Sequence, residues 1–137
     1  MKNSKVICLG NQKGGCAKTS DCLNIAYCLA NTKGYKVLLI DFDSQGSASL
    51  NLGIDISDDD TNTIDEIMGA YVNGTIDRFD WEDVKEFIYT PTYFARRRVA
   101  NSAKWESVNM PFGFDIIPAA MAFIDRDPRA GGVSIMM

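Results

Sequence analysis

The sequence has no apolar run that approaches the roughly 20 residues needed by a membrane-spanning helix. Its N-terminus also lacks the apolar stretch that forms the core of a secretory signal peptide. Both absences argue against a membrane-embedded or exported protein. We therefore expect a cytoplasmic protein that makes no membrane contact.

The sequence also lacks the close cysteine pairs, such as Cys-x-x-Cys, that zinc and iron–sulfur sites usually contain. Its four cysteines, Cys8, Cys16, Cys22 and Cys28, are spaced by eight, six and six residues. We expect Cys8, Cys22 and Cys28 to be small buried side chains in a reducing compartment rather than metal ligands. Cys16 lies in a glycine-rich loop, where backbone donors would favour the thiolate, and its sensitivity to oxidation is a hypothesis.

The composition is that of a single globular domain. The 137 residues are 46% hydrophobic and 23% charged, which disfavours disorder and allows one core but not two. The net charge of −4 argues against a surface built throughout to hold nucleic acid, although a local basic patch is compatible with it.

The most informative stretch is a glycine-rich loop, Gly10 to Ser20, between two elements of regular structure. An apolar run over residues 5–9 predicts a strand before it, and helical periodicity over residues 21–31 predicts a helix after it. Backbone N–H groups around Gly14 and Gly15, together with the helix N-terminus, suit phosphate. Lys18 adds a positive charge and the Thr19 hydroxyl is a ligand for Mg²⁺.

The loop departs from the usual phosphate-binding spacing, because Gln12 and Ala17 occupy its two glycine positions. It instead matches Lys-Gly-Gly-x-x-Lys-Thr/Ser, beginning at Lys13. This pattern resembles the deviant Walker A loop of the ParA/MinD family of ATPases, which segregate plasmids and chromosomes or position division sites. Asp21 replaces a small hydroxyl residue of that family and adds negative charge near the phosphates.

A second candidate segment follows the apolar run at residues 36–40, which predicts a strand buried on both faces. Strand, helix and strand in this order predict a right-handed parallel crossover with ligands at the carboxyl ends of the strands. Asp41 and Asp43 follow the carboxyl end of this strand, in a run that resembles the first switch region of the ParA family. Ser44 and Ser47 replace its proline and asparagine.

The resemblance implies an α/β, P-loop NTPase-like fold with a parallel sheet, flanking helices and a nucleotide site. The implied cofactors are ATP and Mg²⁺, with Thr19 on the metal and Asp41 near its water shell. Asp43 would position the attacking water, and Lys13 would reach the phosphates of a partner across a nucleotide-sandwiched homodimer. The nucleotide-binding residues implied in this way are Lys13, Gly14, Gly15, Cys16, Ala17, Lys18, Thr19 and Ser20; the catalytic ones are Lys13, Lys18 and Asp43.

The rest of the sequence predicts packing elements and one segment that is hard to interpret. Helices are expected over residues 63–72, with Thr63 and Glu66 as a capping box, and over residues 80–88; a strand is expected at 114–119 and a helix start at 120–125. Residues 90–113 contain Arg96, Arg97 and Arg98 among aromatic residues. A solvated surface loop, a partner-docking loop and a contact with nucleic acid are all compatible with that composition.

No apolar strand that ends in Asp-x-Pro-Pro, the Walker B motif of the family, is present. We therefore expect residues 1–137 to be the N-terminal portion of one ParA-like domain, with about three strands of a larger sheet. A ParB-like partner and DNA would be bound through the absent part, with nucleoid association in a complete protein. The alternatives are a catalytically inactive remnant or interaction module, and a MinD-like or nitrogenase-reductase-like protein.

Overall fold

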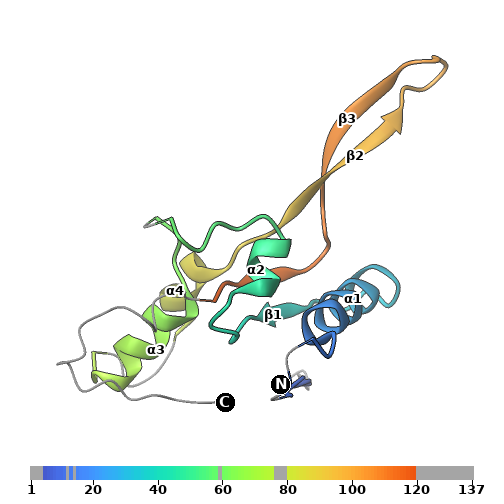
Figure 1. Ribbon diagram of the computed structural model, residues 1–137. Helices are drawn as coiled ribbons and strands as arrows, with labels where there is room; N and C mark the ends of the chain where they lie inside the picture. Colours follow the sequence, from blue (N-terminus) through green and yellow to red (C-terminus); the bar gives the residue numbers. More distant parts are fainter. Residues whose placement is uncertain (1–4, 12, 14, 59, 76–79, 120–137) are drawn as a thin grey trace.

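The computed structural model describes residues 5–11, 13, 15–58, 60–75 and 80–119. Its elements run from an N-terminal helix to a short final strand (Figure 1). They are α1 (Lys18–Asn31), β1 (Leu38–Ile40), α2 (Ser47–Asn51), α3 (Ile64–Val72), α4 (Trp81–Val84), the 3-10 helix η1 (Lys85–Phe87), β2 (Thr92–Arg98), β3 (Trp105–Pro111) and β4 (Asp115–Ile117). The helix start expected at residues 120–125 lies outside the described residues.

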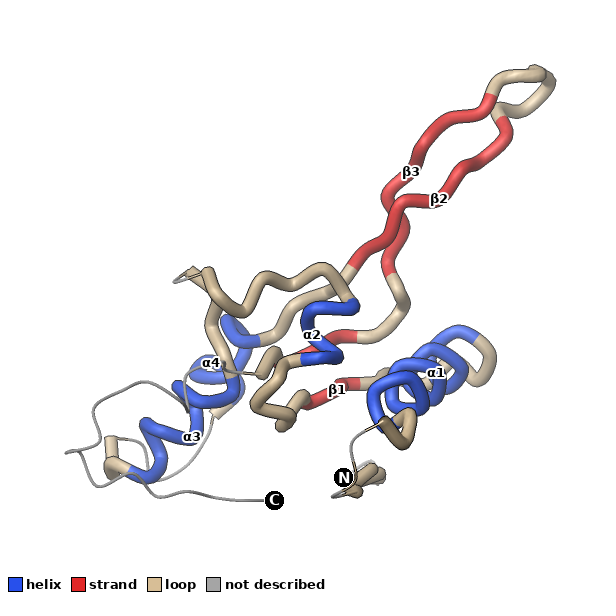
Figure 2. The backbone as a smooth tube through the Cα atoms, viewed as in Figure 1, coloured by secondary structure: helices blue, strands red, loops and turns tan. Residues whose placement is uncertain are grey.

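The body of the protein is built on a parallel strand pair. β1 pairs in parallel with β4, with Leu39 opposite Ile116, and on the other edge of β4 Tyr89 forms an antiparallel bridge with Ile116. Helix α1 packs beside β1 and α2, as Figure 2 shows. The predicted α/β class with a parallel sheet is therefore confirmed.

The core is small and lies between α1, α2 and the sheet. Its buried members are Ala26, Leu52, Phe114 and Ile116. The half-buried residues packed against them are Leu23, Ala30, Val37, Leu39, Ile54, Tyr89 and Phe112. Ile116 has no exposed surface, because it lies on the strand that has a neighbour on both edges.

The strand predicted at residues 5–9 is not formed. These residues are irregular, and Val6 is 94% exposed. The prediction that the strand at 36–40 is buried on both faces is also wrong, since Leu38 and Ile40 are 45% and 42% exposed. A strand is stable only when a neighbour accepts its hydrogen bonds, and within the described residues β1 pairs on one edge alone.

Both helices predicted between residues 60 and 90 are present. Thr63 and Glu66 form the expected capping box at the start of α3. The second helix is shorter than expected and is divided into α4 and η1. None of the described helices has the length and apolar character needed to cross a membrane.

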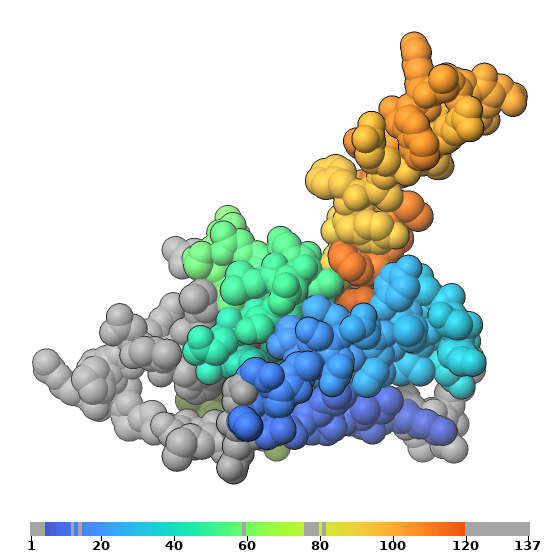
Figure 3. Space-filling view, turned by 45° about the vertical axis from the view of Figure 1, so that its right-hand side comes forward, coloured from blue at the N-terminus to red at the C-terminus, as the bar shows by residue number. Residues whose placement is uncertain are grey.

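Residues 90–113 are not a surface loop, one of the interpretations that the sequence allowed. β2 and β3 pair over seven residues as an antiparallel hairpin, from Thr92 opposite Pro111 to Arg98 opposite Trp105. The hairpin projects away from the body (Figure 3). The sequence did not predict a strand in this segment.

Candidate functional site

The glycine-rich loop leads directly into the N-terminus of α1. Gly15 and Ala17 have left-handed backbones, with φ of 72° and 62°. The N–H of Asp21 donates to the carbonyl of Ala17 at 2.9 Å, which closes the first turn of the helix. Because Ala17 has no side chain able to cap, the first N–H groups of this fourteen-residue helix are available to a ligand.

The remaining loop residues are only partly described. Gln12 and Gly14 lie outside the described residues. The backbone N–H of Lys13 donates to Asn11 Oδ1 at 3.0 Å, and Lys13 is exposed. The exposed Lys13 side chain is long enough to extend beyond its own loop.

A surface hollow of about 260 Å³ lies beside the loop. Its lining includes both a positive side chain, Lys18, and a negative one, Asp21. The other lining residues are Cys8, Leu9, Gly10, Asn11 and Cys16. Asp21 lies in the first turn of α1, where a carboxylate suits the helix dipole but repels a phosphate.

The carboxylate of Asp41 is held by the polypeptide at the carboxyl end of β1. Its Oδ2 accepts hydrogen bonds from the N–H and the hydroxyl of Ser49, at 3.0 and 2.8 Å. Its Oδ1 accepts from the N–H of Asp43 at 3.2 Å. Asp41 is 5% exposed, so this arrangement satisfies a buried charge with three donors.

Ser49 also connects Asp41 to the end of β4. Its hydroxyl oxygen accepts a hydrogen bond from the N–H of Ala119 at 3.1 Å, and the residue is fully buried. Sequence analysis did not single out Ser49, because a serine eight residues after an aspartate carries no local signal. The link joins β1, α2 and the segment after β4 into one unit.

Asp43 initiates the turn into α2. Its Oδ1 accepts from the N–H of Gln45 at 3.0 Å, and its carbonyl accepts from the N–H of Gly46 at 2.7 Å. Gly46 has φ of 58°, and a Cβ there would lie 2.0 Å from Ile56 Cδ1. The left-handed backbone and this close approach both favour glycine at position 46.

The Asp41 segment acts electrostatically on the helix that follows the glycine-rich loop. The pKa of Cys22 is raised, first by burial and then by the negative charges of Asp41 and Asp21. This places Asp41 within range of the second turn of the helix that follows the loop.

The expectation for the cysteines needs correction. Cys8 and Cys28 are exposed, and Cys22 is only half-buried. The sheet that would cover Cys8 is not formed around residues 5–9. Within the part of the chain that the structure describes, no three Cys, Asp or Glu side chains gather in a metal-binding group.

Comparison with known proteins gives a family match over most of the chain and relatives that match up to half of it. A family model described as an AAA domain matches residues 4–128. Sporulation initiation inhibitor protein Soj of Bacillus subtilis is 41% identical over 78 residues, which cover 50% of this chain and 30% of the relative. Chromosome partitioning protein ParA of Myxococcus xanthus is 44% identical over 64 residues, 47% of this chain and 22% of the relative.

A third relative matches a shorter stretch. Chromosome-partitioning ATPase Soj of Thermus thermophilus is 50% identical over 48 residues, 35% of this chain and 19% of the relative. The chain thus spans less than a third of the length of these curated relatives. No solved structure matches the chain significantly.

Proposed function

Because the chain belongs to the ParA/MinD-type family of P-loop proteins, we propose that it binds ATP with Mg²⁺ as the N-terminal portion of a partition ATPase. The observation that carries the proposal is the junction of loop and helix. Two left-handed residues, Gly15 and Ala17, turn the backbone immediately before Lys18, the first residue of α1. Such a turn presents backbone N–H groups to an anion, and the helix dipole adds to their effect.

The residues around this junction fit a polyphosphate. The backbone N–H groups of the loop would hold the phosphate oxygens, and the Lys18 ammonium, which borders the hollow, would neutralise their charge. Asp21 opposes this attraction and would weaken it. The full set that we propose to contact the nucleotide is Lys13, Gly14, Gly15, Cys16, Ala17, Lys18, Thr19 and Ser20.

The proposed metal ligands are Thr19, directly, and Asp41, through water. Mg²⁺, when bound, supplies charge neutralisation on the phosphate oxygens. Both oxygens of Asp41 already accept hydrogen bonds from protein groups, so contact through water fits better than direct ligation. Thr19 is half-buried in the first turn of α1, beside Lys18.

Hydrolysis would additionally need Asp43, which we propose orients the attacking water, and Lys13, which would reach a second copy of the chain. Asp43 is half-buried and Lys13 is exposed. The proposed partners are this second copy and, from the family, a ParB-like protein. We propose a cytoplasmic location, with nucleoid association in a complete protein, and plasmid or chromosome segregation as the process.

A nucleotide-binding module without hydrolysis is the second candidate. Among the residues that the structure describes, β1 has no neighbour on its second edge, and Leu38 and Ile40 are exposed beside the segment that carries Asp41; this favours the second candidate. An incomplete sheet holds its catalytic groups less rigidly than a covered one.

Calorimetric titration with Mg-ATP and a hydrolysis assay separate the two candidates. We expect Lys18→Ala to weaken ATP binding at least tenfold, since it removes the charge that pairs with the phosphates. Lys33→Ala removes an exposed lysine beyond the other end of α1 and should change nothing. Equal hydrolysis by the wild type and Lys18→Ala would exclude catalysis by this chain, and equal binding would exclude the nucleotide site itself.

A further inference from the structure

The β2–β3 hairpin has two different faces, because side chains alternate along each strand. One face is anchored to the body. The ring of Tyr93 lies 4.9 Å from that of Phe112, which in turn lies 6.0 Å from the ring of the buried Phe114. This row of aromatic rings fixes the base of the hairpin to the core.

On the same face, a glutamate neutralises the charge of the one arginine. Arg97 lies opposite Glu106, and its Nη2 and Nε donate to Glu106 Oε1 at 2.7 and 3.1 Å. The anchored face therefore presents little net charge to an outside partner.

The opposite face is exposed along its whole length. It carries Arg96 and Arg98 together with Phe94, which is 83% exposed, and Trp105, which is 58% exposed. The strand residues of this face are Thr92, Phe94, Arg96, Arg98, Trp105, Ser107, Asn109 and Pro111, and none is acidic. Two large exposed aromatic side chains, on a face that carries two arginines and no acidic strand residue, indicate a ligand-binding surface.

The charge of the hairpin contrasts with that of the chain. Residues 92–111 contain four basic residues and one acidic residue, a net charge of +3, whereas the whole chain carries −4. The hairpin, which projects from the body in Figure 3, is therefore a net positive element of a net negative chain. By net charge, a long polyanion would be attracted to the hairpin more strongly than to the remainder of the chain.

We propose that the exposed face of the hairpin binds single-stranded nucleic acid. Phe94 and Trp105 would stack on bases, and Arg96 and Arg98 would contact the backbone phosphates. Arginines interleaved with exposed aromatic rings are the combination that holds single strands without sequence preference. This site is separate from the nucleotide-binding loop and does not depend on it.

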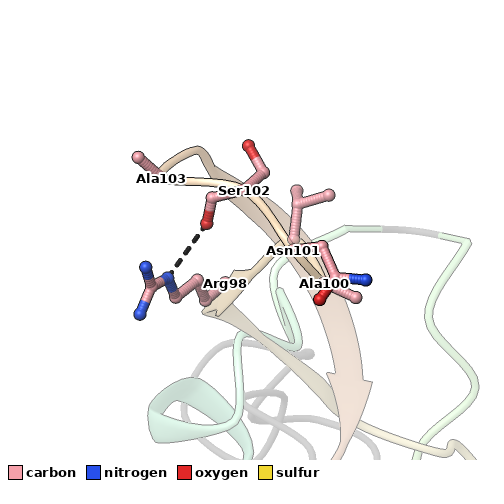
Figure 4. A pocket seen from close by; sticks show the side chains of 6 residues that line it. Arg98, Ala100, Asn101, Ser102 and Ala103 are labelled. Atoms are coloured by element: carbon pink, nitrogen blue, oxygen red, sulfur yellow. Dashed lines mark hydrogen bonds between the residues drawn. The ribbon is translucent and has the colours of Figure 1, made fainter.

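The tip of the hairpin holds one of these arginines in place. Arg98 Nε donates to the carbonyl oxygen of Ser102 at 3.0 Å, and Figure 4 shows the two terminal nitrogens of the guanidinium pointing away from the loop. Arg98 lines a hollow of about 510 Å³ with the loop residues that follow it. An arginine oriented in this way loses less side-chain entropy when it binds a phosphate.

Fluorescence polarisation with a labelled oligothymidylate of about 20 nucleotides tests the proposal. We expect the double variant Phe94→Ala, Trp105→Ala, which leaves the net charge unchanged, to weaken binding about tenfold or more. Both side chains are exposed, so their loss does not open the core. The matched control is Arg97→Ala with Glu106→Ala, which alters the anchored face at constant net charge and should change the affinity less than twofold.

Two further measurements make the test independent of the folding of any single variant. In a Trp81→Phe background, the oligonucleotide should quench the fluorescence of Trp105. Replacing Arg96 and Arg98 with glutamine should flatten the salt dependence of binding by a slope of about 1.4. Lys18→Ala should bind the oligonucleotide normally, which separates this proposal from the nucleotide site.

The proposal is overturned if the wild-type chain does not bind the oligonucleotide, or if the control variant loses as much affinity as the aromatic variant. It is also overturned if a duplex of the same length binds more tightly than the single strand, or if the basic face instead mediates self-association of the chain, detected by light scattering.

Discussion

Replacing Ser49 with alanine should destabilise the protein more than any other single-atom deletion in the site. The Ser49 hydroxyl donates to Asp41 Oδ2 at 2.8 Å and accepts from the N–H of Ala119 at 3.1 Å. All three residues are buried, at 0%, 5% and 1% exposure. The variant thus removes a donor from a buried charge and leaves a buried N–H without its acceptor.

The magnitude follows from these two losses. A hydrogen bond to a charged group contributes about 1.5–3 kcal/mol, and an unsatisfied buried donor costs about 1–3 kcal/mol. The Asp41 carboxylate retains the N–H groups of Ser49 and Asp43, and some relaxation is expected, which lowers the sum. We therefore expect the free energy of unfolding to fall by about 3 kcal/mol.

Urea unfolding followed by tryptophan fluorescence and by circular dichroism measures this change. The matched control is Ser47→Ala, in the first turn of the same helix, which should shift the free energy of unfolding by less than about 0.5 kcal/mol. A loss below about 1 kcal/mol for Ser49→Ala, or an equal loss for both variants, would refute the reasoning. In the first case water or another group would satisfy Asp41 and Ala119 equally well.

Two more predictions concern the loop and the helix after it. Ala17 has a left-handed backbone that disfavours any side chain, so Ala17→Gly should raise the free energy of unfolding by about 0.5–1 kcal/mol, measured by the same urea titration; a loss of stability would contradict the strain. Burial and nearby carboxylates raise the pKa of the Cys22 thiol above 9.0, so its alkylation, followed by mass spectrometry across pH, should reach half-maximal rate above that pH. Folding favours the protonated thiol, so the contribution of Cys22 to stability is lost as the pH rises through that range, and a midpoint below 9.0 would contradict the burial.

The elements predicted correctly are those whose cause lies in a few neighbouring residues. Thr63 and Glu66 satisfy each other's backbone N–H groups, and this reciprocal capping can be recognised from a spacing of three. The strand predicted at residues 36–40 is present at 38–40, because an apolar β-prone run ends there at a carboxylate. Local chemistry decides these cases.

The elements missed depend on partners distant in the chain. Residues 5–9 have the composition of a strand, but no described strand donates to them or accepts from them, so the pattern alone does not produce a sheet. The hairpin has no Asn-Gly turn to announce it; its tip instead uses Asn101, with φ of 58°. Its register depends on cross-strand pairs such as Arg97 with Glu106. Because three arginines are consecutive, the sequence does not indicate which of them lies opposite Glu106.

The candidate site was predicted in outline for the same reason. Lys18 and Asp41 could be identified from motifs that are contiguous in sequence. Two of the three hydrogen bonds that hold Asp41 come from Ser49, whose hydroxyl also contacts Ala119, 70 residues later, and nothing in the sequence specifies that contact. Motifs therefore indicated the candidate groups, and tertiary packing determined how they are held.

The base of the hairpin makes the segment a replaceable module. The N–H of Phe112 donates to the carbonyl of Pro91 at 3.0 Å, so the chain leaves the body and returns to it at adjacent points. Because closing a loop costs little more as the loop lengthens, a segment with joined ends tolerates changes of length. We expect that exchanging residues 92–111 for a short turn would leave the body folded, and that this position is where proteins of this kind can gain or lose a whole binding element without redesigning their core.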